Sequence, residues 1–210
     1  MTNILIADDH MIVREGLKQI LADTPDMVVT DEAKNGEEAL SKALGSDFDV
    51  VVLDIALPDK SGLEVLRQIR DRKPKLPVLI LSMYPEDQFA LRVLKAGASG
   101  YLNKESAPEE LINALRKASN GAKYISDTLL EEIADTLDFT TERPAQEMLS
   151  DREFQVLCLI ASGKSVKEIA GKLEINIKTV STYRLRILEK MRMKNNSELT
   201  YYAVKNQLVN

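Results

Sequence analysis

Short apolar segments alternate with amphipathic stretches along the first 120 residues, and this alternation restricts the fold more than any other feature of the chain. The apolar segments are rich in Val, Ile and Leu and nearly continuous, as strands buried on both faces are. They predict strands over residues 3–7, 27–33, 50–54, 78–82 and 98–102. Helical patterns lie between them, over residues 13–21, 36–45, 61–73, 86–96 and 107–119. Five such repeats predict an α/β fold with a doubly wound, five-stranded parallel sheet.

Polar residues follow several predicted strands at the edge of the sheet where ligands bind, beyond the carboxyl ends of the strands. Asp8 and Asp9 follow the first strand, and Asp54 ends the third. Each alone is equally well explained as a turn residue, but three converging carboxylates repel one another unless a hard cation such as Mg²⁺ neutralises them. Ser82 ends the fourth strand and Lys104 follows the fifth. Carboxylates, metal, hydroxyl and ammonium together predict a pocket for a phosphoryl group.

Composition excludes several other kinds of site. The chain of 210 residues has one cysteine, Cys158, and one histidine, His10, too few for a disulfide framework or a Cys/His zinc site. We expect Cys158 to be a core residue and His10 a loop residue beside the pocket. No apolar run approaches the ~20 residues that span a bilayer, and the first residues lack the features of a signal peptide. We therefore expect a cytoplasmic protein with no membrane partner.

Charge separates the end of the chain from the rest. The whole chain carries a net charge of −5, yet residues 148–210 carry +5 and residues 126–147 carry −6. A basic terminal module favours a polyanionic partner, most often nucleic acid, although a merely solvated charged face has the same composition. We assign residues 122–147 to a linker with a helix capped by Ser126. Its acidic charge is either a solvated helix face or a mask for the basic tail.

Four helices are predicted in the basic tail, over residues 151–161, 166–173, 177–192 and 198–207. Ser150 with Glu153 and Ser165 with Glu168 have the spacing of capping boxes, and Ser197 is expected to cap the fourth helix. The second and third helices are joined by a three-residue turn. This arrangement in a basic module predicts a helix-turn-helix.

The third predicted helix sorts its residues by face. A helical stripe of apolar residues is expected to pack inward: Val180, Tyr183, Ile187, Leu188 and Met191. The opposite face consists of Lys178, Ser181, Thr182, Leu185 and Arg186. A face that is polar and basic in its N-terminal half suits a helix that enters the major groove of DNA.

The motifs ILIADDH, VVLDIALPDKSG, LILSM and AGASGYLNK make residues 3–120 resemble the receiver domain of bacterial two-component response regulators, which is flavodoxin-like. The resemblance implies that Asp54 is the phosphoacceptor. It assigns Mg²⁺ binding to Asp8, Asp9, Asp54 and the backbone carbonyl of Ala56. It makes Ser82 and Tyr101 the switch residues and Lys104 the cation that binds a phosphoryl oxygen. Many receivers have Pro after this lysine with a cis peptide before it, whereas this chain has Glu105, which leaves the local geometry open.

The segment LSDREFQVLCLIASGKSVKEIAGKLEINIKTVSTYRLRILEKM resembles the LuxR-type four-helix module of the NarL/FixJ class of response regulators. On this resemblance Ser181, Thr182 and Leu185 occupy base-reading positions. Phosphate contacts fall to Lys178, Thr179, Arg184 and Arg186. Charged residues are frequent in the family where this chain has Ser181 and Leu185, so the target sequence cannot be transferred from relatives.

Together these features predict a receiver over residues 1–121, a linker over 122–147 and an all-α DNA-binding domain over 148–210. The expected protein is a phosphorylation-dependent transcription regulator and not an enzyme. Its expected partners are a sensor histidine kinase, double-stranded DNA and a second copy of the chain, with RNA polymerase left open. A receiver-like regulator that works without phosphate is the alternative. A haloacid-dehalogenase phosphatase would need Asp at position 56, and a flavin-binding module would need a hydroxyl- and glycine-rich loop after the first strand.

Overall fold

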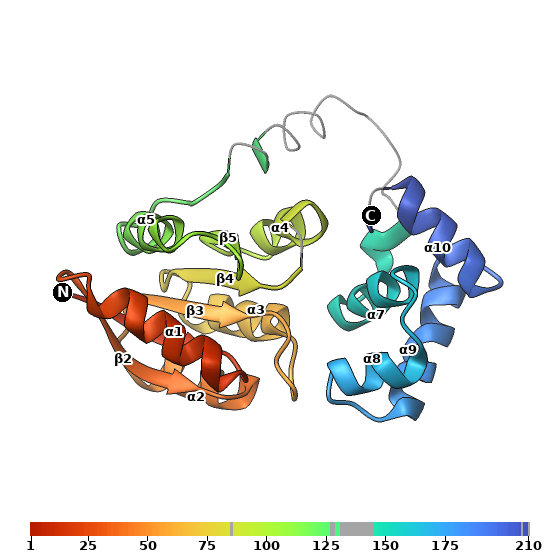
Figure 1. Cartoon of the computed structure of the whole chain (residues 1–210), viewed down its shortest axis with the longest axis horizontal. Coiled ribbons are helices and arrows are strands. Elements are labelled where there is room, and N and C mark those ends of the chain that lie inside the picture. The colour runs from red at the N-terminus through yellow and green to blue at the C-terminus, as the bar shows by residue number, and fades with distance from the viewer. Residues whose placement is uncertain (85, 127–128, 131–144, 207, 210) are drawn as a thin grey trace. The chain divides into compact units, whose positions relative to one another are not determined.

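Five parallel strands form one sheet in the order β2-β1-β3-β4-β5, as the computed structural model shows (Figure 1). The strands are β1 (Thr2–Ala7), β2 (Met27–Ala33), β3 (Val50–Asp54), β4 (Val78–Ser82) and β5 (Gly100–Asn103). The structure describes residues 1–84, 86–126, 129–130, 145–206 and 208–209. The chain divides into two compact units, Met1–Ile133 and Ala134–Asn210, and the sheet belongs to the first. The predicted doubly wound parallel sheet is confirmed.

Helices alternate with the strands, as the amphipathic patterns predict. They are α1 (Met11–Ala22), α2 (Gly36–Gly45), α3 (Gly62–Arg72), α4 (Glu86–Lys95) and α5 (Pro108–Ser119). Strand β5 begins two residues later than predicted. Gly97, with φ 99°, lies in the turn that ends α4, and the Ala98 N–H donates to the Val93 carbonyl at 3.2 Å. Residues 97 and 98 therefore close the helix and do not belong to the strand.

The two faces of the sheet are covered by different helices. One core cluster joins α1 and α5 to alternate strand residues, among them Ile4, Ile6, Val52 and Leu81. Side chains in a strand alternate between faces, so Leu5, Val51 and Ile80 point to the other side, and all are fully buried. This burial on both faces explains why the strand sequences are continuous apolar runs.

The chain after α5 turns back along the edge strand β5. Gly121 adopts φ 78°, and the Tyr124 N–H then donates to the Ser99 carbonyl at 2.7 Å. Gly100 and Tyr124 form a parallel bridge. A Cβ atom at Gly100 would lie 2.8 Å from the Tyr124 carbonyl oxygen, so this close approach requires glycine. The first residues that we assigned to the linker thus cover part of the β5 edge.

The second unit is helical. It contains a 3₁₀ turn η1 (Ala145–Met148) and the helices α7 (Asp151–Ala161), α8 (Val166–Lys172), α9 (Ile177–Lys190) and α10 (Asn196–Lys205). Helix α7 packs against α9 and α10, and α8 packs against α9. Its core contains Phe154, Leu157, Ile169, Val180, Ile187 and Leu199. Cys158 is buried, as predicted.

Most helix starts in this unit match the sequence prediction. Both predicted capping boxes form, at Ser150–Glu153 and at Ser165–Glu168. The prediction for α10 is wrong, because its N-cap is Asn195 and not Ser197. The Asn195 side chain accepts the Glu198 N–H at 3.0 Å, which places the helix start two residues earlier. Asn and Ser are comparable caps, so the spacing to Glu198 decides between them.

The linker helix is only partly described. The Leu129 N–H donates to the Ser126 hydroxyl at 3.2 Å, and the Leu130 N–H donates to the Ser126 carbonyl at 3.0 Å. These contacts agree with a helix start at Ser126. The rest of the predicted helix falls largely outside the described residues.

Candidate functional site

A group of charged residues lies at the carboxyl edge of the sheet, next to the point where the strand order reverses. Strand β1 pairs with both β2 and β3, so Asp8 and Asp9 at the end of β1 lie beside Asp54 at the end of β3. Doubly wound sheets bind their ligands at this switch point. Lys104 joins the group from the end of β5, and its backbone N–H donates to the Ser82 carbonyl at 2.8 Å.

The ammonium of Lys104 bridges two buried carboxylates. Its Nζ lies 2.7 Å from Asp54 Oδ2 and 2.5 Å from Asp8 Oδ2. Asp8 and Asp54 are each only 2% exposed. Asp54 Oδ1 accepts the backbone N–H of Ala56 at 3.1 Å. The predicted phosphoacceptor is therefore held at both carboxylate oxygens.

Burial and charge act against each other on the pocket's ionisable groups. Burial raises the pKa of Asp54, and the negative charge of Asp8 raises it further. The positive charge of Lys104 lowers this pKa, but the net direction is upward. Burial lowers the pKa of Lys104, but the charges and hydrogen bonds of Asp54 and Asp8 outweigh it and raise the pKa overall. Lys104 thus remains a cation, and its charge, together with the hydrogen bond from the Ala56 N–H, favours the ionised form of Asp54.

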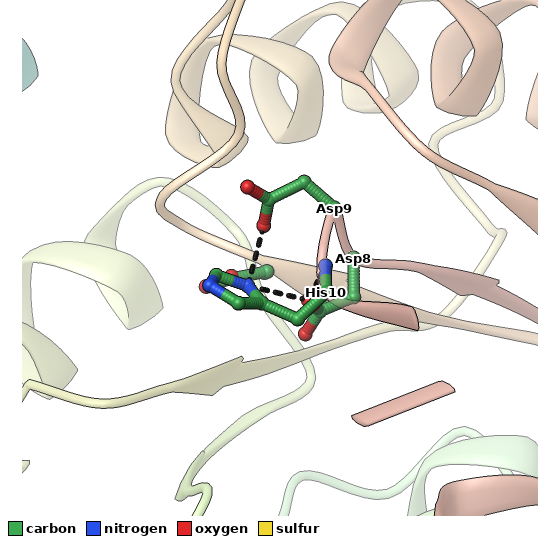
Figure 2. A group of neighbouring side chains, drawn as sticks. Asp8, Asp9 and His10 are labelled. Carbon is green, nitrogen blue, oxygen red and sulfur yellow. Dashed lines mark hydrogen bonds and ion pairs between the residues drawn. The ribbon is translucent and has the colours of Figure 1, made fainter. Parts of the chain in front are cut away.

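Figure 2 shows the imidazole of His10 turned toward the carboxylates of Asp8 and Asp9. Its Nδ1 lies 2.7 Å from Asp9 Oδ1 and 3.2 Å from Asp8 Oδ1. The His10 backbone N–H also donates to Asp8 Oδ1 at 2.8 Å. The His10 side chain is 60% exposed. His10 is therefore a loop residue at the mouth of the pocket, as predicted.

The side chains at the pocket suit a hard divalent cation. Ligand atoms of Asp8, Asp9, His10 and Asp54 lie within 4.8 Å of one another. Three carboxylates face a single lysine in the described part of this pocket, so negative charge is left over for a cation to balance. Carboxylate oxygens are the ligands that Mg²⁺ prefers. Asp8, Asp9 and Asp54 fit the predicted metal site, and the carbonyl of Ala56 stays a prediction.

The two predicted switch residues meet through Tyr84. The hydroxyl of Ser82, which is fully buried, accepts the Tyr84 N–H at 3.2 Å. The hydroxyl of Tyr101, which is 1% exposed, donates to the Tyr84 carbonyl at 2.6 Å. Asn103 donates to the same carbonyl at 3.3 Å. The peptide after Lys104 is trans, as are all peptides of the described chain.

Two residues of this site were not found from the sequence. Tyr84 connects the switch residues through its backbone, which leaves no mark in a sequence pattern. Arg14 is 5% exposed and donates to the Asp8 carbonyl at 2.8 Å. A signal for Arg14 existed, because it shares the spacing of Leu17 and Leu21 and so lies on the buried face of α1.

The predicted base-reading residues lie on accessible parts of α9. Leu185 is 62% exposed, Thr182 is exposed and Ser181 is partly exposed. The hydroxyls of Ser181 and Thr182 donate to the carbonyls four residues earlier, at 3.1 Å and 3.0 Å. Because these hydroxyl protons are already donated, the hydroxyl oxygens can only accept hydrogen bonds from a partner.

The predicted phosphate-binding residues differ in their surroundings. Lys178 and Arg186 are exposed, and Thr179 is partly exposed. Arg184 Nε donates to Asn196 Oδ1 at 2.5 Å, which ties it to the start of α10. Tyr183, expected in the core, is only partly buried, because it lies at the border of the inward stripe.

None of the helices in the described part of the chain has the length and apolar character needed to cross a bilayer. Family models match both units: the response regulator receiver domain over residues 4–116, and the luxR family of bacterial regulatory proteins over residues 147–203.

Relatives align along the whole chain. It is 35% identical to the response regulator UvrY of Escherichia coli strain K12, over 100% of this chain and 97% of that protein. It is 36% identical to the response regulator GacA of Pseudomonas aeruginosa, over 100% and 98%. The chain is also similar to a solved structure of RcsB from Salmonella enterica serovar Typhimurium, which is bound to promoter rprA in the presence of the phosphomimetic BeF3⁻. The TM-score is 0.64 and the sequence identity 29%, over 97% of this chain and 99% of RcsB. The chain therefore belongs to the two-component response regulators of the NarL/FixJ class, which join a receiver domain to a LuxR-type DNA-binding domain.

Proposed function

We propose that Asp54 accepts a phosphoryl group from a sensor histidine kinase and that this modification controls DNA binding by α9. The observation that carries the proposal is the contact of Lys104 with both Asp54 and Asp8 at the switch point of the sheet. A lysine ammonium beside a buried carboxylate favours its ionised form, which is the form that acts as a nucleophile.

The transfer begins with attack of an Asp54 carboxylate oxygen on the phosphorus of a phosphohistidine. The new P–O bond forms as the P–N bond breaks, and the electron pair of that bond stays with the leaving imidazole, which takes up a proton. Mg²⁺ held by Asp8, Asp9, Asp54 and the Ala56 carbonyl would stabilise negative charge on the transferring group. Lys104 donates to a phosphoryl oxygen, which replaces the carboxylate oxygen that it now contacts.

Modification then changes the contacts of Ser82 and Tyr101. The Ser82 hydroxyl turns from the Tyr84 N–H toward the phosphoryl group, and Tyr101 moves with the loop because it is bonded to the Tyr84 carbonyl. The phosphoryl group thereby shifts an existing equilibrium between two receiver conformations. Chemistry at Asp54 is limited to accepting and slowly losing the phosphoryl group, so the protein is a regulator and not an enzyme in the usual sense.

The second unit supplies the DNA contacts. Ser181, Thr182 and Leu185 of α9 read bases in the major groove, while Lys178, Thr179, Arg184 and Arg186 contact phosphates. RcsB has been solved with DNA, and as two dimers on two parallel DNAs, which supports double-stranded DNA as the ligand and a homodimer as the binding form. We further infer that the protein acts on chromosomal DNA in the cytoplasm, where RNA polymerase is available as a partner. We retain the division into receiver 1–121, linker 122–147 and DNA-binding domain 148–210.

The test combines a mass measurement with DNA binding. Incubation of the full chain with acetyl phosphate and Mg²⁺ is expected to add one phosphoryl group and to tighten binding to a selected DNA site. The variant Asp54→Asn, and wild type with chelator, should show neither effect. Asp71→Asn, which changes an exposed carboxylate on α3, serves as the matched control. An unmodified wild type, with a phosphorylated kinase also ineffective, would contradict the proposal.

A further inference from the structure

A buried arginine lies directly behind the acidic pair. Arg14 is on α1, and its side chain is 6% exposed. Its Nη1 donates to the backbone carbonyl of Asp8 at 2.8 Å, and its Nε donates to Glu32 Oε2 at 2.8 Å. A buried guanidinium needs such partners, and its planar fork fixes the direction of both bonds. Arg14 therefore joins the end of β1 to β2 through two directional contacts.

The contact with Asp8 fixes more than one atom. The carbonyl of Asp8 belongs to the peptide unit that leads into Asp9, and a peptide unit is planar. The other polar groups of Asp8 are also held: its N–H donates to the Ala33 carbonyl at 3.1 Å, and its carboxylate contacts Lys104 and the His10 N–H. With the carbonyl held by Arg14, the plane of the Asp8–Asp9 peptide is set, and with it the position of the Asp9 Cα atom from which the side chain extends.

Glu32 is itself anchored, which makes it a firm support for Arg14. Lys18 Nζ lies 2.8 Å from Glu32 Oε1, on the oxygen that Arg14 does not use. The hydrogen bond from Lys18 lowers the pKa of Glu32, burial opposes it, and Arg14 adds to the lowering. Glu32 thus stays ionised near neutral pH. Lys18 touches Glu32 without contacting the Asp8–Asp9 loop in any described hydrogen bond or ion pair.

We propose that Arg14 is a positioning residue for the magnesium site, which sets the Asp8–Asp9 peptide so that both carboxylates face one cation. The inference rests on the proposed role of Asp8, Asp9 and Asp54 in binding Mg²⁺. Arg14 does not touch the metal or the phosphoryl group. It acts through the backbone, as outer partners that orient metal ligands do.

The positive charge of Arg14 and its positioning role predict opposite changes in Mg²⁺ affinity when Arg14 is replaced. If Arg14 acted only through its positive charge, its removal in Arg14→Met would tighten binding of a cation. If it positions the acidic pair, Arg14→Met weakens Mg²⁺ binding, and Arg14→Lys does so too, because one ammonium cannot reproduce the two-point contact. We expect an increase of about tenfold in the Mg²⁺ dissociation constant in both variants.

The experiment is a titration of the unphosphorylated full chain with Mg²⁺, followed by the ¹H–¹⁵N amide signals of Asp9 and Asp54. A second readout is the rate of phosphorylation by acetyl phosphate. At saturating Mg²⁺ this rate should return to nearly the wild-type value, because only the affinity for the metal has changed. Lys18→Met is the matched control, since it removes a cation from Glu32 and leaves the loop contact in place. It should keep the wild-type dissociation constant within twofold.

Each result has a distinct meaning. Wild-type affinity or tighter binding in the Arg14 variants overturns the positioning role, and so does a lowered thermal midpoint with an unchanged dissociation constant. If Arg14→Met does not fold, Arg14→Lys decides by the same criteria. A wild type without Mg²⁺-dependent shifts would overturn the magnesium site itself and, with it, this inference. Wild-type binding with unaffected Arg14 variants would leave the site intact and overturn the inference alone.

Discussion

Lys104 is the residue on which the charge balance of the pocket depends. Its ammonium contacts Asp8 and Asp54, both of which are almost fully buried. Removing one partner of a buried ion pair leaves uncompensated charge and typically costs 3 to 5 kcal/mol. We expect Lys104→Met to lower the free energy of unfolding at neutral pH by about 3 kcal/mol without Mg²⁺. Urea unfolding in the presence of chelator measures this loss.

The same variant should change how stability responds to pH and to metal. The pKa of Asp54 is already raised by burial, and loss of Lys104 raises it further. A raised carboxyl pKa in the folded state means that stability is fully present below the unfolded value, near 3.8, and is lost as pH rises through the folded value. Lys104→Met should therefore be least harmful in acid, and Mg²⁺ should restore more stability to it than to wild type. Lys75→Met, at an exposed lysine, should show neither effect.

At this scale the sequence predicts side chains better than backbone contacts. Asp8, Asp54 and Lys104 were predictable because parallel strands bring their carboxyl ends to one edge. The Arg14 side chain contacts a backbone carbonyl, and Tyr84 contacts Ser82 and Tyr101 through its own backbone. Because every residue type has a backbone carbonyl, a sequence pattern does not mark such contacts. Arg14 could be flagged as a charged residue on a buried helix face, but its target could not be named without the structure.

The capping box of α7 does more than start a helix. Glu153, with a side chain 3% exposed, accepts the Ser150 N–H at 2.7 Å, and its Oε2 also binds Lys190 Nζ at 2.6 Å. Burial raises the pKa of Glu153, but the hydrogen bonds from Lys190 and Ser150 outweigh it, and the pKa is lowered. The start of α7 is thereby fastened to the end of α9.

We expect Glu153→Gln to destabilise the second unit by about 1 to 2 kcal/mol at pH 7, because glutamine keeps the cap and loses the charged contact. A lowered carboxyl pKa gives stability that is present above the unfolded value, near 4.5, and is lost as pH falls through the folded value. The difference between wild type and variant should therefore vanish in acid. Urea unfolding followed by the amide signals of α7 measures it. Glu168→Gln, in the exposed capping box without a described ion pair, should have a smaller effect; an equal effect would show that Lys190 is not the cause.

On the proposed function, helix α9 separates residues that read bases from residues that contact DNA phosphates. Arg186→Ala should weaken binding to all sequences and lower the slope of log affinity against log salt by about 0.9, one phosphate contact. Thr182→Ala and Leu185→Ala should change base preference by about 1 to 3 kcal/mol and leave the slope unchanged. Site selection from random DNA, followed by salt titration, measures both. Lys75→Ala in the receiver is the control. If Thr182→Ala and Leu185→Ala both selected the wild-type DNA sequence, this face of α9 would not be the one that enters the groove.

Element boundaries were predictable where local chemistry decides them. The capping boxes at Ser150 and Ser165 start α7 and α8 at the predicted residues, because side chain and backbone satisfy each other within four positions. The start of α10 was missed because Asn195 and Ser197 are both good caps by residue type, and only the three-residue spacing from Asn195 to Glu198 distinguishes them. The edge bridge at Tyr124 joins residues far apart in sequence, and no periodic pattern records it.

Coupling between the two units should appear as a change in how the whole chain binds paired sites. Two linked contacts gain affinity through effective concentration, so a phosphorylated dimer should prefer DNA with two half-sites over DNA with one by about 100-fold. Sedimentation velocity and fluorescence anisotropy, with and without acetyl phosphate, measure dimerisation and binding. Linkage also requires that DNA with two half-sites favours the dimer over the monomer by the same factor by which dimerisation tightens binding to that DNA. Asp54→Asn should show no response to acetyl phosphate. A full response of this variant would show that dimerisation and DNA binding are not controlled through Asp54.

The bridge between Gly100 and Tyr124 has a consequence for solubility. Strand β5 is the last strand of the sheet, and an uncovered last strand offers free backbone groups to the sheet of another molecule. The Tyr124 N–H occupies the Ser99 carbonyl, so the chain shields its own edge with the residues that follow α5. A receiver cut after Gly121 would expose that edge and tend to associate edge to edge. A receiver that extends through Ser126 would keep the shield and stay dispersed.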